Sequence, residues 1–219
     1  ENVFWVPTDA RWNVIADAAH QPNIGVVIDN AMTSIEKDNT RLKNVLPKNY
    51  ARPELDKIKL GEVVEIFDNV NMHSQGEDFD ILGRIYEYCL NQFAAEAKQK
   101  GGEFYTPACI VRTLVEVLEP YEGRVYDPAC GSGGMFVQSA KFIQNHRGDL
   151  KKIHIFGQEY NANTWKMAQM NLAIRGIDAD LGSSWGDSFS DDKHATEKFD
   201  FVMANPPFNM QDWGAERLA

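Results

Sequence analysis

The chain has 219 residues, of which 43% are hydrophobic, and a net charge of −10 from 22 basic and 32 acidic residues. This length fits one large domain or two small ones, with the composition of an ordinary soluble globular protein. No apolar run approaches the roughly 18 residues of a membrane-spanning helix, and no signal-peptide pattern is present, so we expect a cytoplasmic protein without membrane contact. Proteins that grip duplex DNA alone usually have a basic face. A nucleic-acid substrate would therefore require positive charge from a partner or from further sequence.

The first 100 residues have helical periodicity and indicate a helical N-terminal domain. Helices are expected over residues 8–16, with Thr8 as the cap, and over residues 24–37, 55–67 and 79–93. Residues 69–77 are polar and indicate a loop. A polar stretch at 98–102 is the expected boundary between domains 1–100 and 101–219.

The remainder alternates between strand and helix patterns. Strands are expected at 124–126, 152–157, 177–183 and 198–204, with helices between them. This alternation predicts an α/β fold with an open, mostly parallel, Rossmann-like sheet that binds ligands at the carboxyl ends of its strands. Asp127, Glu159, Asp187 and Asn205 all fall at such ends.

The sequence Asp127-Pro128-Ala129-Cys130-Gly131-Ser132-Gly133-Gly134 joins the first strand to a helix. A glycine-rich turn at a helix N-terminus lets a ligand approach the bare backbone. The carboxylate at the strand end would repel a phosphate and attract a sulfonium or amine, which favours S-adenosylmethionine over a dinucleotide. A structural turn without a ligand is the alternative.

Two further acidic residues follow later strands. Glu159 can bind both hydroxyls of a ribose, or it is a charge favoured by the helix dipole. Asp187 can accept a hydrogen bond from an adenine amine, although Gly-Asp-Ser is also common in turns.

The sequence Asn205-Pro206-Pro207-Phe208 directly follows the last strand. Its prolines cannot donate ladder hydrogen bonds and form a stiff corner. The Asn205 amide oxygen and the Pro206 carbonyl can each accept one hydrogen of an aromatic amine, which frees the nitrogen lone pair in the transition state. Phe208 can stack on a base that has been flipped out of the duplex. A proline-rich strand exit without chemistry is the alternative.

The sequence Gly102-Glu-Phe-Tyr-Thr-Pro107 lies at the start of a further helix, with Thr106 as its expected N-cap and Pro107 as its first helical residue. Together with 127–134 and 205–208, it resembles the amino-methylating DNA adenine methyltransferases. The helical N-terminal region, which ends in Asp80-Ile-Leu-Gly-Arg-Ile-Tyr-Glu-Tyr88, is more narrowly similar to the modification (M) subunit of type I restriction–modification enzymes.

The resemblance implies site residues. It assigns catalysis at the target base to Asn205, Pro206, Pro207 and Phe208. It assigns cofactor binding to Glu103, Phe104, Tyr105, Thr106, Pro107, Asp127, Pro128, Ala129, Gly131, Ser132, Gly133, Glu159 and Asp187. Cys89, Cys109 and Cys130 lack metal-type spacing, so no metal site is expected.

The same resemblance implies S-adenosyl-L-methionine as cofactor and DNA with a flipped adenine as substrate. It also implies a specificity (S) subunit, a second M subunit and a restriction (R) subunit as partners. The family's sheet continues beyond four strands, so we expect the methyltransferase domain to be incomplete at its C-terminus. Glu1 is not an initiator methionine, so we expect a fragment or a processed chain. A solitary DNA methyltransferase, a methyltransferase of RNA bases or protein glutamine, and a non-catalytic cofactor-binding piece remain alternatives.

Overall fold

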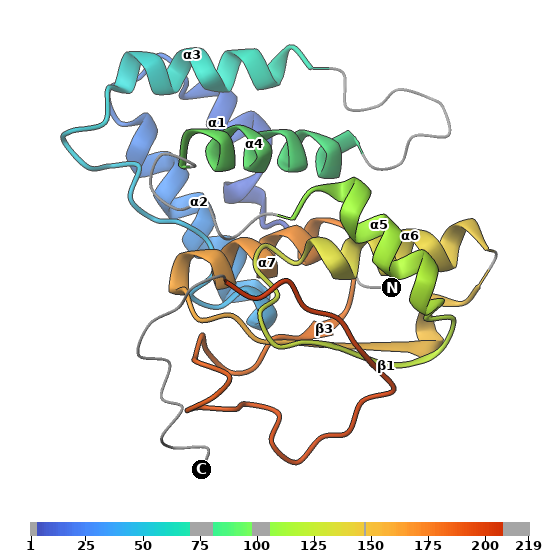
Figure 1. Ribbon diagram of the computed structural model, residues 1–219. Helices are drawn as coiled ribbons and strands as arrows, with labels where there is room; N and C mark the ends of the chain where they lie inside the picture. Colours follow the sequence, from blue (N-terminus) through green and yellow to red (C-terminus); the bar gives the residue numbers. More distant parts are fainter. Residues whose placement is uncertain (1–3, 71–80, 98–105, 147, 208–219) are drawn as a thin grey trace. The chain divides into compact units, whose positions relative to one another are not determined.

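The computed structural model describes residues 4–70, 81–97, 106–146 and 148–207. The chain divides into two compact units, Glu1–Ile81 and Leu82–Ala219 (Figure 1). This division lies earlier than the boundary near residue 100 that the sequence indicates, because helix α4 (Ile81–Ala97) is tied to the second unit. The Tyr86 hydroxyl of α4 donates to the Met167 carbonyl at 2.9 Å. Within the described ranges, no helix has both the length and the apolarity to cross a membrane.

The first unit is helical, as predicted. Its elements are η1 (Thr8–Ala10), α1 (Trp12–Asp17), α2 (Ile24–Asp38), η2 (Thr40–Leu42) and α3 (Lys57–Asp68). The expected cap at Thr8 is wrong, since Thr8 opens a separate 3-10 turn and α1 begins after Arg11. The core of this unit is formed by buried aliphatic side chains, among them Ile15, Ile24, Ile28 and Val64.

Two carboxylates on α2 hold the connection between α2 and α3. Asp29 accepts the backbone N–H groups of Tyr50 and Ala51 at 2.9 and 3.0 Å. Glu36 accepts those of Asn44 and Leu46 at 3.0 and 2.8 Å, and it pairs with Lys48. Although burial opposes the charge, these donors lower the pKa of Glu36.

The second unit contains the predicted parallel sheet. Its elements after α4 are α5 (Ala108–Leu118), β1 (Gly123–Asp127), α6 (Gly134–Asn145), η4 (Leu150–Lys152), β2 (Ile153–Gly157), α7 (Ala162–Ile174), β3 (Ala179–Asp180) and β4 (Phe201–Val202). All pairings are parallel, in the order β3-β2-β1-β4. Helices α6 and α7 lie on one face of the sheet, where α5 packs against α6 (Figure 1).

Aromatic rings cover the opposite face. Tyr126 of β1 stacks on Phe199 with ring centroids 4.3 Å apart, and both contact Phe156 or the buried His194. The His194 ring bonds to the Gly157 carbonyl at 3.0 Å. His194 is therefore a structural residue.

The third and fourth strands are shorter than predicted. Only Phe201 and Val202 of the expected strand 198–204 form β4, which pairs with β1. Backbone bonds of Asp200 and Met203 to β1 carry this pairing one residue further in each direction.

We predict that Gly25→Ala destabilises the first unit. A Cβ at Gly25 of α2 would lie 2.2 Å from the Tyr50 carbonyl oxygen, so backbone must move. The gain in helix propensity, about 0.5–1 kcal/mol, is smaller than the overpacking cost of about 1–3 kcal/mol. Denaturant unfolding measures the change, and Asn30→Ala, at an exposed position of the same helix, is the control. Equal stability of the two variants would contradict this close packing.

Candidate functional site

The site lies where the strand order reverses. From β1 the chain adds β2 and β3 on one side, whereas β4 pairs on the other side of β1. In open α/β sheets such a reversal opens a crevice at the carboxyl ends of the strands. One cavity there is lined by both Asp127, which ends β1, and Asn205, which follows β4. The sequence-based expectation that strand-end residues meet is confirmed for this pair.

The glycine-rich turn forms one wall of this cavity. Gly131 and Gly133 have φ angles of +55° and +79°, and Gly133 is the N-cap of α6. These positive φ values favour glycine. A Cβ added at Gly134 would meet no atom within 4 Å, so there is open space beside the first residue of α6. The N-terminus of a helix is a common site for binding polar ligand groups.

Asp127 is a buried carboxylate, with an exposed fraction of 1%. Its Oδ1 accepts the backbone N–H of Ala129 at 2.9 Å. Burial raises the pKa of Asp127 to about 7, and the charge of Glu159 acts in the same direction. The cavity therefore stabilises a positive charge beside Asp127 and disfavours an anion.

Glu159 connects the ends of β1 and β2. Its two carboxylate oxygens accept the backbone N–H groups of Gly131 at 3.0 Å and Asn161 at 2.8 Å. Burial raises the pKa of Glu159, and these two N–H groups partly offset that effect. Asn161 caps α7 by accepting the backbone N–H groups of Asn163 and Thr164. Glu159 thus already holds the turn in place without a ligand.

Sequence reasoning missed the neighbouring residue, Gln158, which is fully buried. Its amide nitrogen donates to the carbonyls of Gly186 and Asp191, and its amide oxygen accepts the N–H of Lys193. A polar residue at the end of an apolar strand, between buried neighbours, was the available signal. Gln158 fixes the loop that contains Asp187.

Asp187 forms part of its own turn. Its carboxylate accepts the Phe189 N–H at 3.0 Å and the Ser190 hydroxyl at 2.9 Å. The adjacent Gly186 N–H donates to the Glu159 carbonyl at 2.9 Å, so the loop is attached beside the end of β2. The turn interpretation accounts for these contacts, and the adenine-binding role stays a prediction.

Asn205 is held by a contact from the start of α5. Its amide nitrogen donates to the Thr106 hydroxyl oxygen at 3.0 Å. The expected N-cap at Thr106 is wrong, because Pro107, with a ψ of 135°, precedes the helix as its cap. Thr106 instead lines the cavity together with Asn205.

Of the other predicted residues, some are described by the structure and some are not. Ala129 and Ser132 line the cavity, and Pro128 accepts the Ser188 hydroxyl through its carbonyl. Pro206 is exposed and Pro207 is half-buried. Glu103, Phe104, Tyr105 and Phe208 lie outside the described residues. Within the described ranges, no group of three or more His, Cys, Asp and Glu side chains could hold a metal ion.

The second unit has the fold of class I S-adenosylmethionine-dependent methyltransferases. Among solved structures, the chain is similar to a type I restriction–modification methyltransferase subunit from Streptococcus thermophilus. That alignment has a TM-score of 0.75 and 22% identity, and covers 94% of this chain and 45% of the other. It supports the fold.

Family models match both parts of the chain. The N-6 DNA Methylase model matches residues 77–219 and the HsdM N-terminal domain model matches residues 1–67. The chain belongs to the N-6 DNA methylase family.

Curated relatives point to the same family. The chain is 42% identical to the type I restriction enzyme HindI methylase subunit of Haemophilus influenzae, over 98% of this chain and 53% of that protein. It is 37% identical to the MjaIX methylase subunit of Methanocaldococcus jannaschii, over 100% of this chain and 39% of that protein. The chain thus spans about half the length, or less, of these relatives.

We predict that Asp127→Asn removes a pH dependence of stability. The pKa of Asp127 rises from 3.8 in water to about 7 in the folded chain. The protonated carboxyl therefore stabilises the folded state fully below pH 4, and this stabilisation is lost as the pH rises through 7. The free energy of unfolding changes by at most about 1.4 kcal/mol per pH unit through this one group. Denaturant midpoints between pH 5 and 8 should fall less in Asp127→Asn than in the wild type.

Asp149→Asn is the control for this experiment, since Asp149 is an exposed carboxylate at the N-cap of η4. It should keep the wild-type pH profile. The same profile in Asp127→Asn would contradict the burial of an ionisable group at the end of β1.

Proposed function

We propose that this chain is the cofactor-binding part of a type I restriction–modification methylase subunit. The whole protein would transfer a methyl group from S-adenosylmethionine to the N6 amine of adenine in a specific DNA sequence. Family membership supports the reaction class. The observation that carries the proposal is the single cavity shared by Asp127 and Asn205, because the donor and the target amine must meet there.

The lining of the cavity fits the cofactor. S-adenosylmethionine supplies an electrophilic methyl group on a positively charged sulfur. Asp127 and Glu159 give the cavity a negative potential that favours such a cation. The open first turn at Gly134 offers backbone N–H groups to the amino-acid end of the cofactor. The oxygens of Glu159, which accept backbone donors, are proposed to accept the ribose hydroxyls as well.

Asn205 is proposed to bind the target amine. Its amide nitrogen is occupied by Thr106, which leaves the amide oxygen to accept a hydrogen from the exocyclic amine. The exposed corner at Pro206 adds a carbonyl acceptor. Withdrawing both hydrogens favours a tetrahedral nitrogen and makes its lone pair available, so the stabilisation acts on the transition state.

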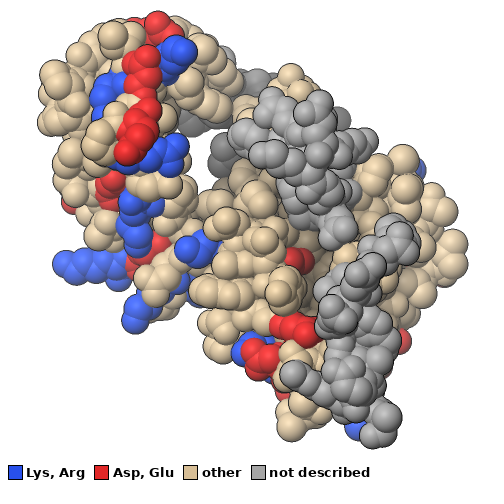
Figure 2. All heavy atoms as spheres, turned by 60° about the vertical axis from the view of Figure 1, so that its left-hand side comes forward, with Lys and Arg blue, Asp and Glu red and all other residues tan. Residues whose placement is uncertain are grey.

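Recognition of DNA is proposed to involve partner subunits. On the face that Figure 2 shows, lysine and arginine are interspersed with aspartate and glutamate among the described residues, and the chain has a net charge of −10. Such a surface binds phosphates poorly on its own. A specificity subunit that reads the sequence, with a second methylase subunit and a restriction subunit in the full complex, would supply what this chain lacks.

We predict that Asp127→Ala weakens binding of S-adenosylmethionine about 10- to 100-fold, because a charge-assisted contact contributes about 1.5–3 kcal/mol. In the wild type, affinity should rise between pH 5 and 8 as the carboxylate ionises. Titration calorimetry on the full-length protein measures both effects, with Asp149→Ala as control. Unchanged affinity in Asp127→Ala would contradict the proposed cation site.

We predict that Asn205→Ala lowers methyl transfer by about 10²–10³-fold, the usual effect of removing a transition-state hydrogen-bonding group, while cofactor affinity changes little. The assay uses the full-length protein with its specificity subunit and radiolabelled cofactor. Asn163→Ala, at an exposed position on α7, is the control. Full activity of Asn205→Ala would contradict the proposed role.

The product separates this reaction from others on the same scaffold. Nucleoside analysis of methylated DNA should show N6-methyl-2′-deoxyadenosine. Label found in RNA or in protein glutamine, with none in DNA, would overturn the proposed substrate.

A further inference from the structure

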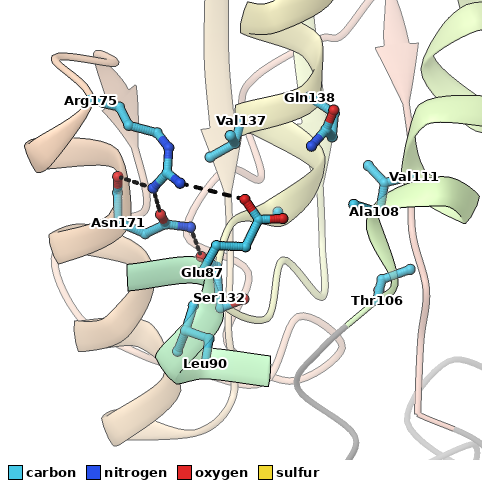
Figure 3. Close-up of a pocket in the computed structure, with 11 residues that line it drawn as sticks. Glu87, Leu90, Thr106, Ala108, Val111, Ser132, Val137, Gln138, Asn171 and Arg175 are labelled. Carbon is cyan, nitrogen blue, oxygen red and sulfur yellow. Dashed lines mark hydrogen bonds and ion pairs between the residues drawn. The ribbon is translucent and has the colours of Figure 1, made fainter. Parts of the chain in front are cut away.

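We infer that Asn171 and Arg175 are positioning residues that hold the cofactor turn and couple it to helix α4. Both lie on or directly after α7, outside the set of residues that the sequence assigns to the site. Neither lines the cavity shared by Asp127 and Asn205, but both line the adjoining pocket in Figure 3, which shares Thr106, Ser132 and Gly134 with that cavity. Their contact with the cofactor turn is through its backbone.

Asn171 contacts the turn directly. Its amide nitrogen donates to the Ser132 carbonyl at 2.8 Å, and both residues are 4% exposed. Ser132 lies between Gly131 and Gly133, the two positions with positive φ. This hydrogen bond holds the peptide group between Ser132 and Gly133, so it opposes rotation of the turn.

Arg175 determines which way the Asn171 amide points. Its guanidinium donates to the Asn171 amide oxygen (Figure 3). Since a guanidinium has donors only, it selects the amide orientation in which the nitrogen faces Ser132. The Ser132 carbonyl, which can only accept, favours the same orientation, so the two contacts support each other. Without Arg175, the Asn171 amide is held from one side only.

The same guanidinium holds α4. It donates to the Gly83 carbonyl at 2.6 Å and lies 3.7 Å from a carboxylate oxygen of Glu87. The Arg175 side chain is only 6% exposed, so these interactions are shielded from solvent. Figure 3 shows the continuous series from Glu87 through Arg175 and Asn171 to Ser132.

Movement of α4 is expected to affect cofactor binding. Displacement of α4 would release Arg175, free the Asn171 amide and loosen the turn. By thermodynamic reciprocity, a ligand that binds the ordered turn must also stabilise α4. Helix α4 is thus proposed to modulate cofactor affinity from outside the cavity.

Two variants test separately the contact of Asn171 with the turn and the contact of Arg175 with α4. In Asn171→Asp, a carboxylate still accepts from Arg175 but faces the Ser132 carbonyl without a donor. It should weaken S-adenosylhomocysteine binding about 10-fold and leave α4 protected from hydrogen exchange. In Arg175→Met, binding should weaken similarly and exchange in residues 82–90 should increase. Circular dichroism establishes that both variants are folded.

Two control variants match these changes. Arg112→Met removes a cation from α5, where the Arg112 side chain is 77% exposed, and Asn163→Ala removes an exposed amide from α7. Both should retain wild-type affinity and exchange. In the wild type, S-adenosylhomocysteine should slow exchange in α4, and this protection should disappear in Arg175→Met.

The affinity measurement rests on the proposed cofactor site, whereas exchange in the ligand-free protein does not. If the wild type fails to bind the cofactor, the proposed function is wrong, and faster exchange of residues 129–135 in Arg175→Met than in Arg112→Met still supports the coupling. Wild-type affinity in both variants, or turn exchange equal to that of the controls, would overturn the inference.

Discussion

The carboxyl group of Asp127 is withdrawn from water at the point where the strand order reverses. Its burial follows the alternation of β1, in which Val125 and Asp127 are buried on the face opposite to that of Tyr126. A side chain placed there cannot keep its usual hydration, so its charge is stabilised only by a cation or by local N–H groups. The cavity around it is therefore selective before any ligand arrives.

The rest of the site is built by hydrogen bonds between loops rather than by apolar packing. Glu159 joins the glycine turn to the end of β2, Asn171 holds the turn from α7, and Thr106 holds Asn205 from the start of α5. Each of these bonds connects residues that are distant in the chain. Methyl transfer needs donor and acceptor held in line, and such connections fix the separation of the two sides of the cavity.

The sequence predicts the sheet and its strand ends well, because alternating periodicities and a glycine turn are local patterns. The convergence of Asp127 and Asn205 could be predicted from the rule that parallel strands share one carboxyl edge. Thr106 illustrates the limit: local chemistry favours an N-cap, but a tertiary hydrogen bond to Asn205 competes with it. Gln158, Asn171 and Arg175 were missed because most of their contacts are with groups distant in the chain, many of them backbone carbonyls, which no local sequence pattern predicts.

Gln158 has a consequence for how this region can change over evolutionary time. The loop around Asp187 is held through main-chain groups of Gly186, Asp191 and Lys193, all of which are present whatever side chains the loop carries. Substitutions along it can therefore alter its chemistry while its path stays the same. Because one buried amide holds the loop through its backbone, the path of the loop does not depend on its side chains. Its specificity can therefore change without a change of fold.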